Sequence, residues 1–298
     1  MWWLVVVGGS MSRMWAMPAS ESAQPEVRAW IQSVRPMPLW FMILALVLYF
    51  VLNYLVNIVA TPAKLLPSLP AATGHVIAPT FLNYVPLFII MGLLLVLIGR
   101  LRCNDLCLIR RRLLPAIAWV VGSWIVAQLF LLLVHLGDVS IDPAWNGRVV
   151  AKISDLITGQ LLGNALYEDV FWRAFLISQL VLLLVRRMKW KFGTALTWAI
   201  LVSSVLFALS HLPHDFAHGF STSQIIYGQL GRLAAGLVLA GLFLLSNNIF
   251  IAIGIHGLVN DPLVLFESSN SELVQVFFVF APLLVLAILA IRRRRASR

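Results

Sequence analysis

The feature that most constrains this chain is a series of apolar runs that are long enough to cross a lipid bilayer. A spanning helix needs about 20 apolar residues, because the hydrocarbon core is about 30 Å thick and an α-helix rises about 1.5 Å per residue. Runs that meet this need occur at about 38–60, 81–99, 113–135, 155–185, 194–211, 225–245, 249–264 and 273–291. The sequence therefore predicts an all-α fold, a polytopic bundle of about eight transmembrane helices.

Composition agrees with a single membrane domain. Hydrophobic residues make up 61% of the chain and charged residues only 11%, against roughly 25% charged in soluble domains, which excludes an ordinary water-soluble fold. Prolines and glycines separate the runs, namely Pro62, Pro67 and Pro70, then Pro143 and Gly147, then Pro213. We expect an N-terminal segment at 1–37, one transmembrane domain at 38–291 and a basic tail at 292–298.

The net charge of +10 comes from 22 Lys and Arg residues that gather at the ends of apolar runs. This placement is a topology signal and not a nucleic-acid patch. Counted by the positive-inside rule, the clusters put both termini in the cytoplasm of a multi-pass cell-membrane protein, with membrane lipids as its surroundings. The clusters are Arg100 and Arg102 with Arg110–Arg112, then Arg186, Arg187, Lys189 and Lys191, then Arg292–Arg295 with Arg298.

Two minor features carry no function of their own. Cys103 and Cys107 fall inside the first basic cluster, on the side predicted to be cytoplasmic and reducing, so a disulfide is not expected there. The apolar start of the chain, Met1–Gly9, has no preceding positive charge and is too short for a signal peptide.

The fourth run is unusually long. As one helix, residues 155–185 would extend roughly 46 Å, well beyond the hydrocarbon core. This helix must tilt, break or protrude. The chain has no internal repeat, which is atypical of a duplicated transporter.

Charged residues inside the fourth run need a physical reason, since one charge at mid-bilayer costs about 2.5–3.5 kcal/mol. Asp169 and Arg173 are four residues apart, so they share a helical face and are expected to form an ion pair. Glu168 points about 100° away on a helix and lacks a local partner. A dry setting would suit it to act as a general base, although all three residues could equally serve to hold the bundle together.

Two further runs carry histidine in a helical pattern. His211 follows Phe207 by four residues, so the two rings share a face. His256 and Asn260 are also four apart, and their imidazole and amide could together bind an oxyanion. The simpler interpretations are an interfacial histidine at 211 and a hydrogen-bonded helix contact at 256 and 260.

For the remaining polar residues near these runs, a structural role is the simpler interpretation. His214 and His218 follow His211 in a loop beside Asp215, where solvated residues are expected. Arg232 lies within the sixth run, where it could cap a helix, meet a lipid phosphate or, less favoured, bind a substrate carboxylate. Gly254 and Gly257 flank His256 and would let a neighbouring helix or a substrate backbone approach closely.

In combination, these three segments resemble the CAAX protease and bacteriocin-processing family of intramembrane endopeptidases. That family has two adjacent acids followed after three residues by Arg, then Phe and His with three residues between them, then His and Asn or a similar polar residue with three residues between them. Here the three motifs occur in order within about 155–264. The residues that match are Glu168, Asp169 and Arg173, then Phe207 and His211, then His256 and Asn260.

The resemblance implies a membrane-embedded peptidase, and because the chain has no His-Glu-x-x-His helix, we expect a glutamate mechanism without a cofactor rather than a zinc mechanism. In it, Glu168, helped by His211, activates a water that attacks the scissile carbonyl, and His256 with Asn260 binds the oxyanion. The usual second acid is Glu, whereas this chain has Asp169, which falls in the predicted ion pair rather than in the water-activating position. The implied partner is a lipidated, membrane-bound or bacteriocin-like peptide. Prenyl-peptide proteases of the family face the cytoplasm, whereas the positive-inside count puts His211 toward the outer face.

Three alternatives stay open from the residues alone. Glu168, His211 and His256 could hold Zn²⁺ with an open fourth position, although the chain has no His-Glu-x-x-His helix. His211 and His256 could be the axial ligands of a haem, which a Soret band would reveal. Glu168 could be the proton carrier of a transporter, which uptake measurements on Glu168→Gln would test.

Overall fold

The computed structural model describes residues 25–59, 62–134 and 140–266, with isolated residues between 277 and 291. Every regular element in these ranges is a helix, and the extended chain there pairs at one isolated antiparallel bridge, between Ile141 and Phe266. The all-α fold is thus confirmed. Most of the eighth predicted run, the start of the chain at 1–24 and the basic tail at 292–298 lie outside the described residues.

The first half of the chain forms three long helical stretches joined by shorter elements and turns. They are α2 (Pro25–Ser33), α3 (Leu39–Tyr54) continued by a π-helical η1 (Leu55–Val59), α4 (Pro62–Leu65), α5 (Leu69–Ala72), α6 (Pro79–Gly92) continued by η2 (Leu93–Ile98), η3 (Arg110–Arg112) and α7 (Leu113–Val134).

The second half begins with a 3₁₀ turn and ends at the last well-defined helix. Its elements are η4 (Pro143–Trp145), α8 (Val149–Ser154), η5 (Asp155–Asn164), α9 (Ala165–Asp169), η6 (Val170–Leu176), α10 (Ile177–Arg186), α11 (Phe192–Leu209), α12 (Leu212–Ala217), α13 (Thr222–Ser246) and α14 (Ile249–Asn260).

Four helical stretches of the described residues are long and apolar enough to cross a membrane by length and composition, and two apolar helices are shorter. The four are Pro79–Ile98, Arg110–Leu133, Phe192–Ala217 and Thr222–Ser246, and the shorter two are Leu39–Tyr54 and Ile249–Asn260. These agree with the predicted second, third, fifth, sixth, first and seventh runs within a few residues. Membrane orientation and the cytoplasmic termini stay predictions.

The predicted fourth run is a broken helix, which is one of the three outcomes that its length allowed. It extends over 149–186, from α8 through η5, α9 and η6 to α10, and we refer to it as the central run. Two of its stretches are π-helical, and Gly163 interrupts the helix with φ −106° and ψ −107°. π-helical turns inside α-helices occur frequently at functional sites. The break lies five residues before Glu168.

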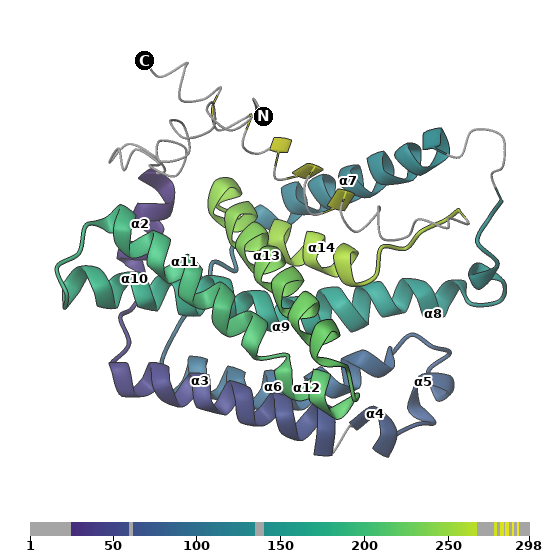
Figure 1. Cartoon of the computed structure of the whole chain (residues 1–298), viewed down its shortest axis with the longest axis horizontal. Coiled ribbons are helices and arrows are strands. Elements are labelled where there is room, and N and C mark those ends of the chain that lie inside the picture. The colour runs from purple at the N-terminus through teal and green to yellow at the C-terminus, as the bar shows by residue number, and fades with distance from the viewer. Residues whose placement is uncertain are drawn as a thin grey trace, which may run out of the picture.

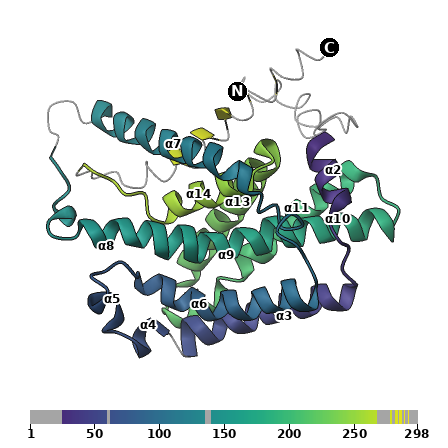
Figure 2. The ribbon, with the colours of Figure 1, turned by 180° about the vertical axis from the view of Figure 1, so that it is seen from behind.

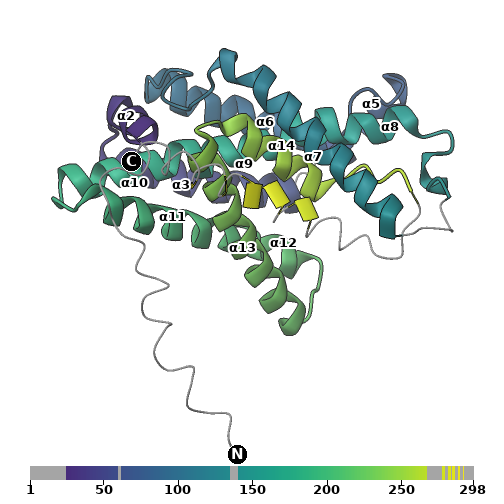
Figure 3. The same cartoon turned by 90° about the horizontal axis from the view of Figure 1, so that it is seen from above.

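The central run forms the middle of the molecule. Figure 1 shows it lying lengthwise, with the α3 and α6 pair along one side and α7 and α14 along the other. The view from behind shows the same order (Figure 2). α11 packs against both α10 and α13, and α14 packs against α7, α13 and η5. The α12 and α13 ends extend away from the body of the bundle (Figure 3).

Local sequence signals account for the ends of α13 and α14. Ser221 and Gln224 form a reciprocal capping box at the start of α13, and Asn247 ends that helix in the left-handed conformation with φ 50°. The side chain of Asn248 then caps α14 by accepting a hydrogen bond from the Phe250 amide.

The helix expected at about 249–264 ends four residues earlier than predicted. α14 stops at Asn260 and the chain continues in an extended conformation from Asp261. The reason is Pro262, which has no amide hydrogen and disfavours helix in the residue before it. Side chains satisfy the extended backbone, since Trp124 and Trp145 donate to the carbonyls of 263 and 264, and Gln128 accepts from the amide of 265.

Aromatic packing fixes the central run against α3. The ring of Tyr49 on α3 stacks on Tyr167 at 5.1 Å and on Phe171 at 4.4 Å, and meets Trp172 edge-on at 4.7 Å. All four rings are buried. Because aromatic pairs stabilise such contacts by about 0.5–1.5 kcal/mol beyond burial, this cluster holds the turn of helix that carries Glu168.

Candidate functional site

Glu168 lies on α9 in the interior of the bundle and is only 4% exposed. Each of its carboxylate oxygens faces an imidazole from a different segment of the chain. Oε1 lies 3.9 Å from Nε2 of His211, and Oε2 lies 3.7 Å from Nε2 of His256. The sequence left Glu168 without a local partner, and the structure shows that both its neighbours come from distant segments.

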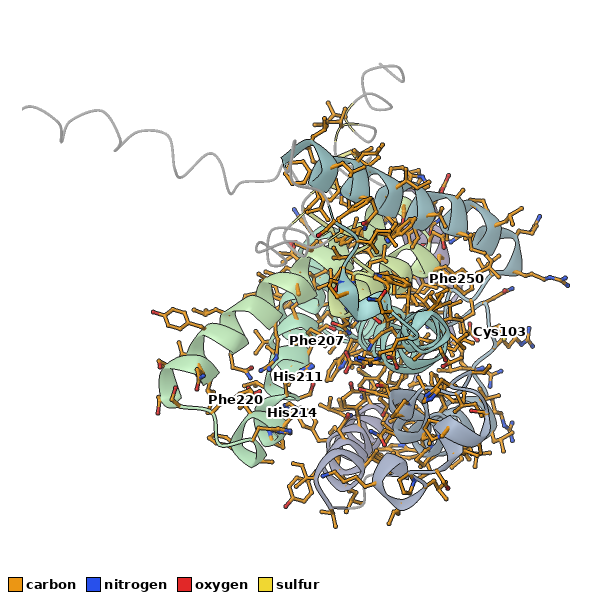
Figure 4. All side chains as sticks on the ribbon, turned by 90° about the vertical axis from the view of Figure 1, so that its right-hand side faces the viewer. Cys103, Phe207, His211, His214, Phe220 and Phe250 are labelled. Carbon is orange, nitrogen blue, oxygen red and sulfur yellow. The ribbon has the colours of Figure 1, made fainter. Side chains whose placement is uncertain are left out.

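His211 follows the end of α11, and the backbone and a ring of the preceding turn hold it in place. Its Nδ1 lies 2.9 Å from the Phe207 carbonyl, and its ring meets the Phe207 ring edge-on at 5.0 Å. A carbonyl oxygen only accepts, so Nδ1 carries a proton and Nε2 is directed at Glu168. Figure 4 shows Phe207, His211 and His214 following one another from the interior toward the α12 end. The predicted ring contact is confirmed.

The expected ion pair between Asp169 and Arg173 is confirmed, with Nε 3.1 Å from Oδ1 and both residues fully buried. The Arg173 guanidinium also lies 4.2 Å from the centre of the Phe207 ring. The other oxygen of Asp169 lies 3.1 Å from Nδ1 of His256. Sequence spacing predicted the pair of Asp169 and Arg173. It did not predict the contact between Asp169 and His256, because His256 belongs to another helix.

His256 and Asn260 share one face of α14, as their spacing predicted. His256 is 5% exposed, whereas Asn260 is exposed at the C-terminal end of the helix. The Nδ2 of Asn260 donates to Oε1 of Gln160 at 3.0 Å. Asn164 also donates to that oxygen, at 3.4 Å.

Gln160 and Asn164 were absent from the sequence-based set of site residues. The signal that would have found them is their four-residue spacing, which leads along an otherwise apolar run to Glu168.

Small residues let α14 lie close to its neighbours. A Cβ atom at position 254 would collide with the side chain of Val120 on α7, and a Cβ at 257 would lie 2.7 Å from Cδ2 of Leu161 in the central run. The close helix approach predicted for Gly254 and Gly257 is therefore confirmed.

Glu168, His211, His256 and Asn260 all line one cavity of about 750 Å³. This volume suits a small molecule or a short peptide segment. α13 contributes glycine and alanine to its wall opposite the central run. The lining residues include Gln160, Asn164, Glu168, Phe207, His211, Gly228, Gly231, Arg232, Ala235, His256 and Asn260.

Arg232 also lines the cavity, but its charge already has a partner. Its Nη1 and Nη2 lie 2.5 and 2.7 Å from the two carboxylate oxygens of Asp215, and Gln229 donates to the same carboxylate at 3.0 Å. Asp215 is fully buried in α12. The sequence placed Asp215 in a loop, whereas the structure places it in the short helix α12, where its partner Arg232, seventeen residues on, comes from α13.

These contacts tie α12 to α13 beside the cavity. The structure does not test whether Arg232 binds a substrate carboxylate, and that stays a prediction. His214 is half-exposed and His218 is exposed, as expected of solvated residues.

Within the described ranges, no group of three or more His, Cys, Asp or Glu side chains is arranged to hold a metal ion. Two ligands of a tetrahedral zinc lie about 3.3 Å apart, given zinc-ligand distances of about 2.0–2.1 Å. For the zinc alternative, these side chains would have to move, because each imidazole lies farther than this from the Glu168 oxygen that it faces, at 3.9 and 3.7 Å. For the haem alternative, the Nε2 atoms of His211 and His256 face opposite oxygens of one carboxylate, so an iron between them would displace Glu168.

Comparison with known proteins gives one finding that bears on this site. Residues 151–260 match the family model described as type II CAAX prenyl endopeptidase Rce1-like. This range runs from α8 through α14 and contains each of the motif residues named above. It agrees with the resemblance inferred from the motifs and supports an intramembrane endopeptidase of the CAAX type. No curated protein and no solved structure gives a match.

Proposed function

We propose that this chain is an endopeptidase that hydrolyses a peptide bond in a membrane-associated or lipidated peptide, using a water activated by Glu168. One observation carries the proposal. A buried carboxylate lies at the wall of a large cavity, with one imidazole facing each of its oxygens. Such a group has few structural uses in an apolar bundle, because a buried charge is costly unless it is paired.

The contact between Glu168 and His211 suits the binding of one water. In neutral His211, Nδ1 donates to the Phe207 carbonyl and Nε2 is an acceptor. Two acceptors 3.9 Å apart leave room for a water at about 2.8 Å from each, a normal hydrogen-bond length. That water donates a proton toward both, so its lone pair is directed at a substrate carbonyl. Glu168 then takes the proton as the water attacks.

His256 is suited to the opposite task of stabilising negative charge. Its Nδ1 faces Asp169, whose other oxygen is paired with Arg173. With a proton on His256, the two carboxylates and two cations of this buried set sum to zero, the least costly state in a dry interior. Nε2 of the imidazolium then donates to the oxyanion that forms on the carbonyl.

Asn260 supplies the second donor for the oxyanion. One N–H of its amide is bonded to Gln160, the other has no hydrogen-bond partner among the described residues, and Asn260 lines the cavity. One positioned donor of this kind contributes about 10²- to 10³-fold to the rate. No covalent intermediate is required, because the attacking group is the water.

The proposal is tested with purified protein in liposomes, incubated with a mixed library of peptides and prenylpeptides and analysed by mass spectrometry. Products from wild type that are absent with Glu168→Gln are the expected result. A folded wild type that cleaves no library member would contradict the proposal. The same reaction with 1,10-phenanthroline separates the glutamate mechanism, which is indifferent to the chelator, from the zinc alternative.

A further inference from the structure

We propose that Gln160 is a positioning residue that aims the amide of Asn260 at the oxyanion. This inference deepens the proposed function and rests on it. Gln160 touches neither the substrate nor the attacking water in this account. It acts through Asn260.

The first support is the hydrogen bonding of the Gln160 side chain. Its Oε1 accepts from Nδ2 of Asn260 at 3.0 Å and from Nδ2 of Asn164 at 3.4 Å. Because an amide nitrogen carries two hydrogens in one plane, committing one of them fixes the direction of the other. The bond to Gln160 therefore orients the free N–H of Asn260.

The second support is that Asn260 has little else to hold it. It is exposed at the end of α14, directly before the extended segment that begins at Asp261. A loose asparagine samples three staggered χ1 positions and two faces of its amide. If all of these orientations were equally populated, the N–H of Asn260 would point at the oxyanion in about one of six.

The third support is a backbone arrangement that brings the two side chains together. A Cβ at Gly257 would lie 2.7 Å from Cδ2 of Leu161 and 3.5 Å from Cβ of Gln160. Because position 257 has no Cβ, the end of the Leu161 side chain lies directly against α14 there, and α14 and η5 pack closely. Asn260, one turn after Gly257, thereby comes within hydrogen-bond distance of Gln160.

Gln160 lies on the same wall of the cavity as the carboxylate. The central run is interrupted at Gly163, between Gln160 and Glu168, so regular helical spacing does not set the relative directions of these two side chains. The broken run nevertheless brings Gln160, Asn164 and Glu168 to the one cavity, which all three line.

The kinetic test uses Gln160→Met, which keeps length and removes the acceptor, on a peptide identified as a substrate. We expect kcat to fall about 5- to 10-fold while KM changes less than about twofold, because ground-state binding does not involve the oxyanion. In an Asn260→Ala background the same change has no further effect. The control is Leu162→Ala, a 51% exposed side chain two residues away, which leaves kcat within about twofold.

A second measurement is independent of activity. In protein labelled with ¹⁵N-asparagine and held in micelles, the side-chain amide signal of Asn260 is identified by its loss in Asn260→Ala. We expect Gln160→Met to shift that signal and Leu162→Ala to leave it in place.

The outcomes separate this inference from the proposed function. An Asn260 signal that does not move overturns the positioning role whatever the activity. A signal that moves while kcat stays at the wild-type value, or falls equally in the Asn260→Ala background, overturns it too. If the signal moves but wild type cleaves no peptide, the proposed function fails, and the bond to Gln160 is only structural.

Discussion

Replacing Arg173 by methionine should destabilise the protein severely. Arg173 is 1% exposed, its Nε is paired with Asp169, and its guanidinium lies on the ring of Phe207. Breaking a buried ion pair by removing one partner costs about 3–5 kcal/mol, and a desolvated cation–π contact adds up to about 2 kcal/mol. Nη1 and Nη2 have no hydrogen-bond partner among the described residues, so the substitution breaks no hydrogen bond of theirs there. We therefore expect the free energy of unfolding to fall by about 3–5 kcal/mol, the lower part of the range that the two contributions span.

The free energy of unfolding is measured by titrating micelles with SDS and following circular dichroism. Removing both charges in Asp169→Asn with Arg173→Met should recover at least about 1 kcal/mol relative to Arg173→Met alone, since the two sites are coupled. Arg186→Met, at an exposed arginine, is the matched control and should change stability by at most about 0.5 kcal/mol. An Arg173→Met protein within about 1 kcal/mol of wild type would refute the reasoning.

Three further predictions concern other parts of the molecule. Cys103 is exposed, whereas burial raises the pKa of the Cys107 thiol, so maleimide at neutral pH should add one label, at Cys103, as mapped by mass spectrometry. Gly254→Ala should lower stability by about 1–3 kcal/mol, because the new Cβ collides with the branched side chain of Val120, and unchanged SDS unfolding would count against the packing described. 1,10-Phenanthroline should leave peptide cleavage unaltered, and loss of activity that added Zn²⁺ restores would favour the zinc alternative.

The sequence pattern was sufficient to predict those structural features that depend on interactions between residues close together in the chain. Apolar length gave the positions of the helices, and the excess length of the fourth run predicted that it tilts, breaks or protrudes, of which the structure shows the break, at Gly163. The same local logic gave the pair of Asp169 and Arg173. The end of α14 was also readable, because Pro262 forbids the helix that apolarity alone extends to 264.

Interactions between distant segments could not be read in this way. No periodicity pairs Asp215 with Arg232 or brings Asp169 to His256, because each contact depends on how two helices pack. The amides of Gln160 and Asn164 were overlooked because neutral polar residues cost less in an apolar run than charges do, and so stood out less. The π-helical geometry of η5 leaves no simple mark in composition.

The central claim is that Glu168 activates the water, and the rate of cleavage of one identified peptide tests it most directly. Wild type and Glu168→Gln are compared in the same liposomes under single-turnover conditions, with peptide binding and SDS unfolding measured for both. The account predicts that the variant binds peptide with similar affinity and cleaves it about 10²- to 10⁴-fold more slowly, the range for loss of a general base. A folded Glu168→Gln protein that cleaves within tenfold of wild type would contradict it.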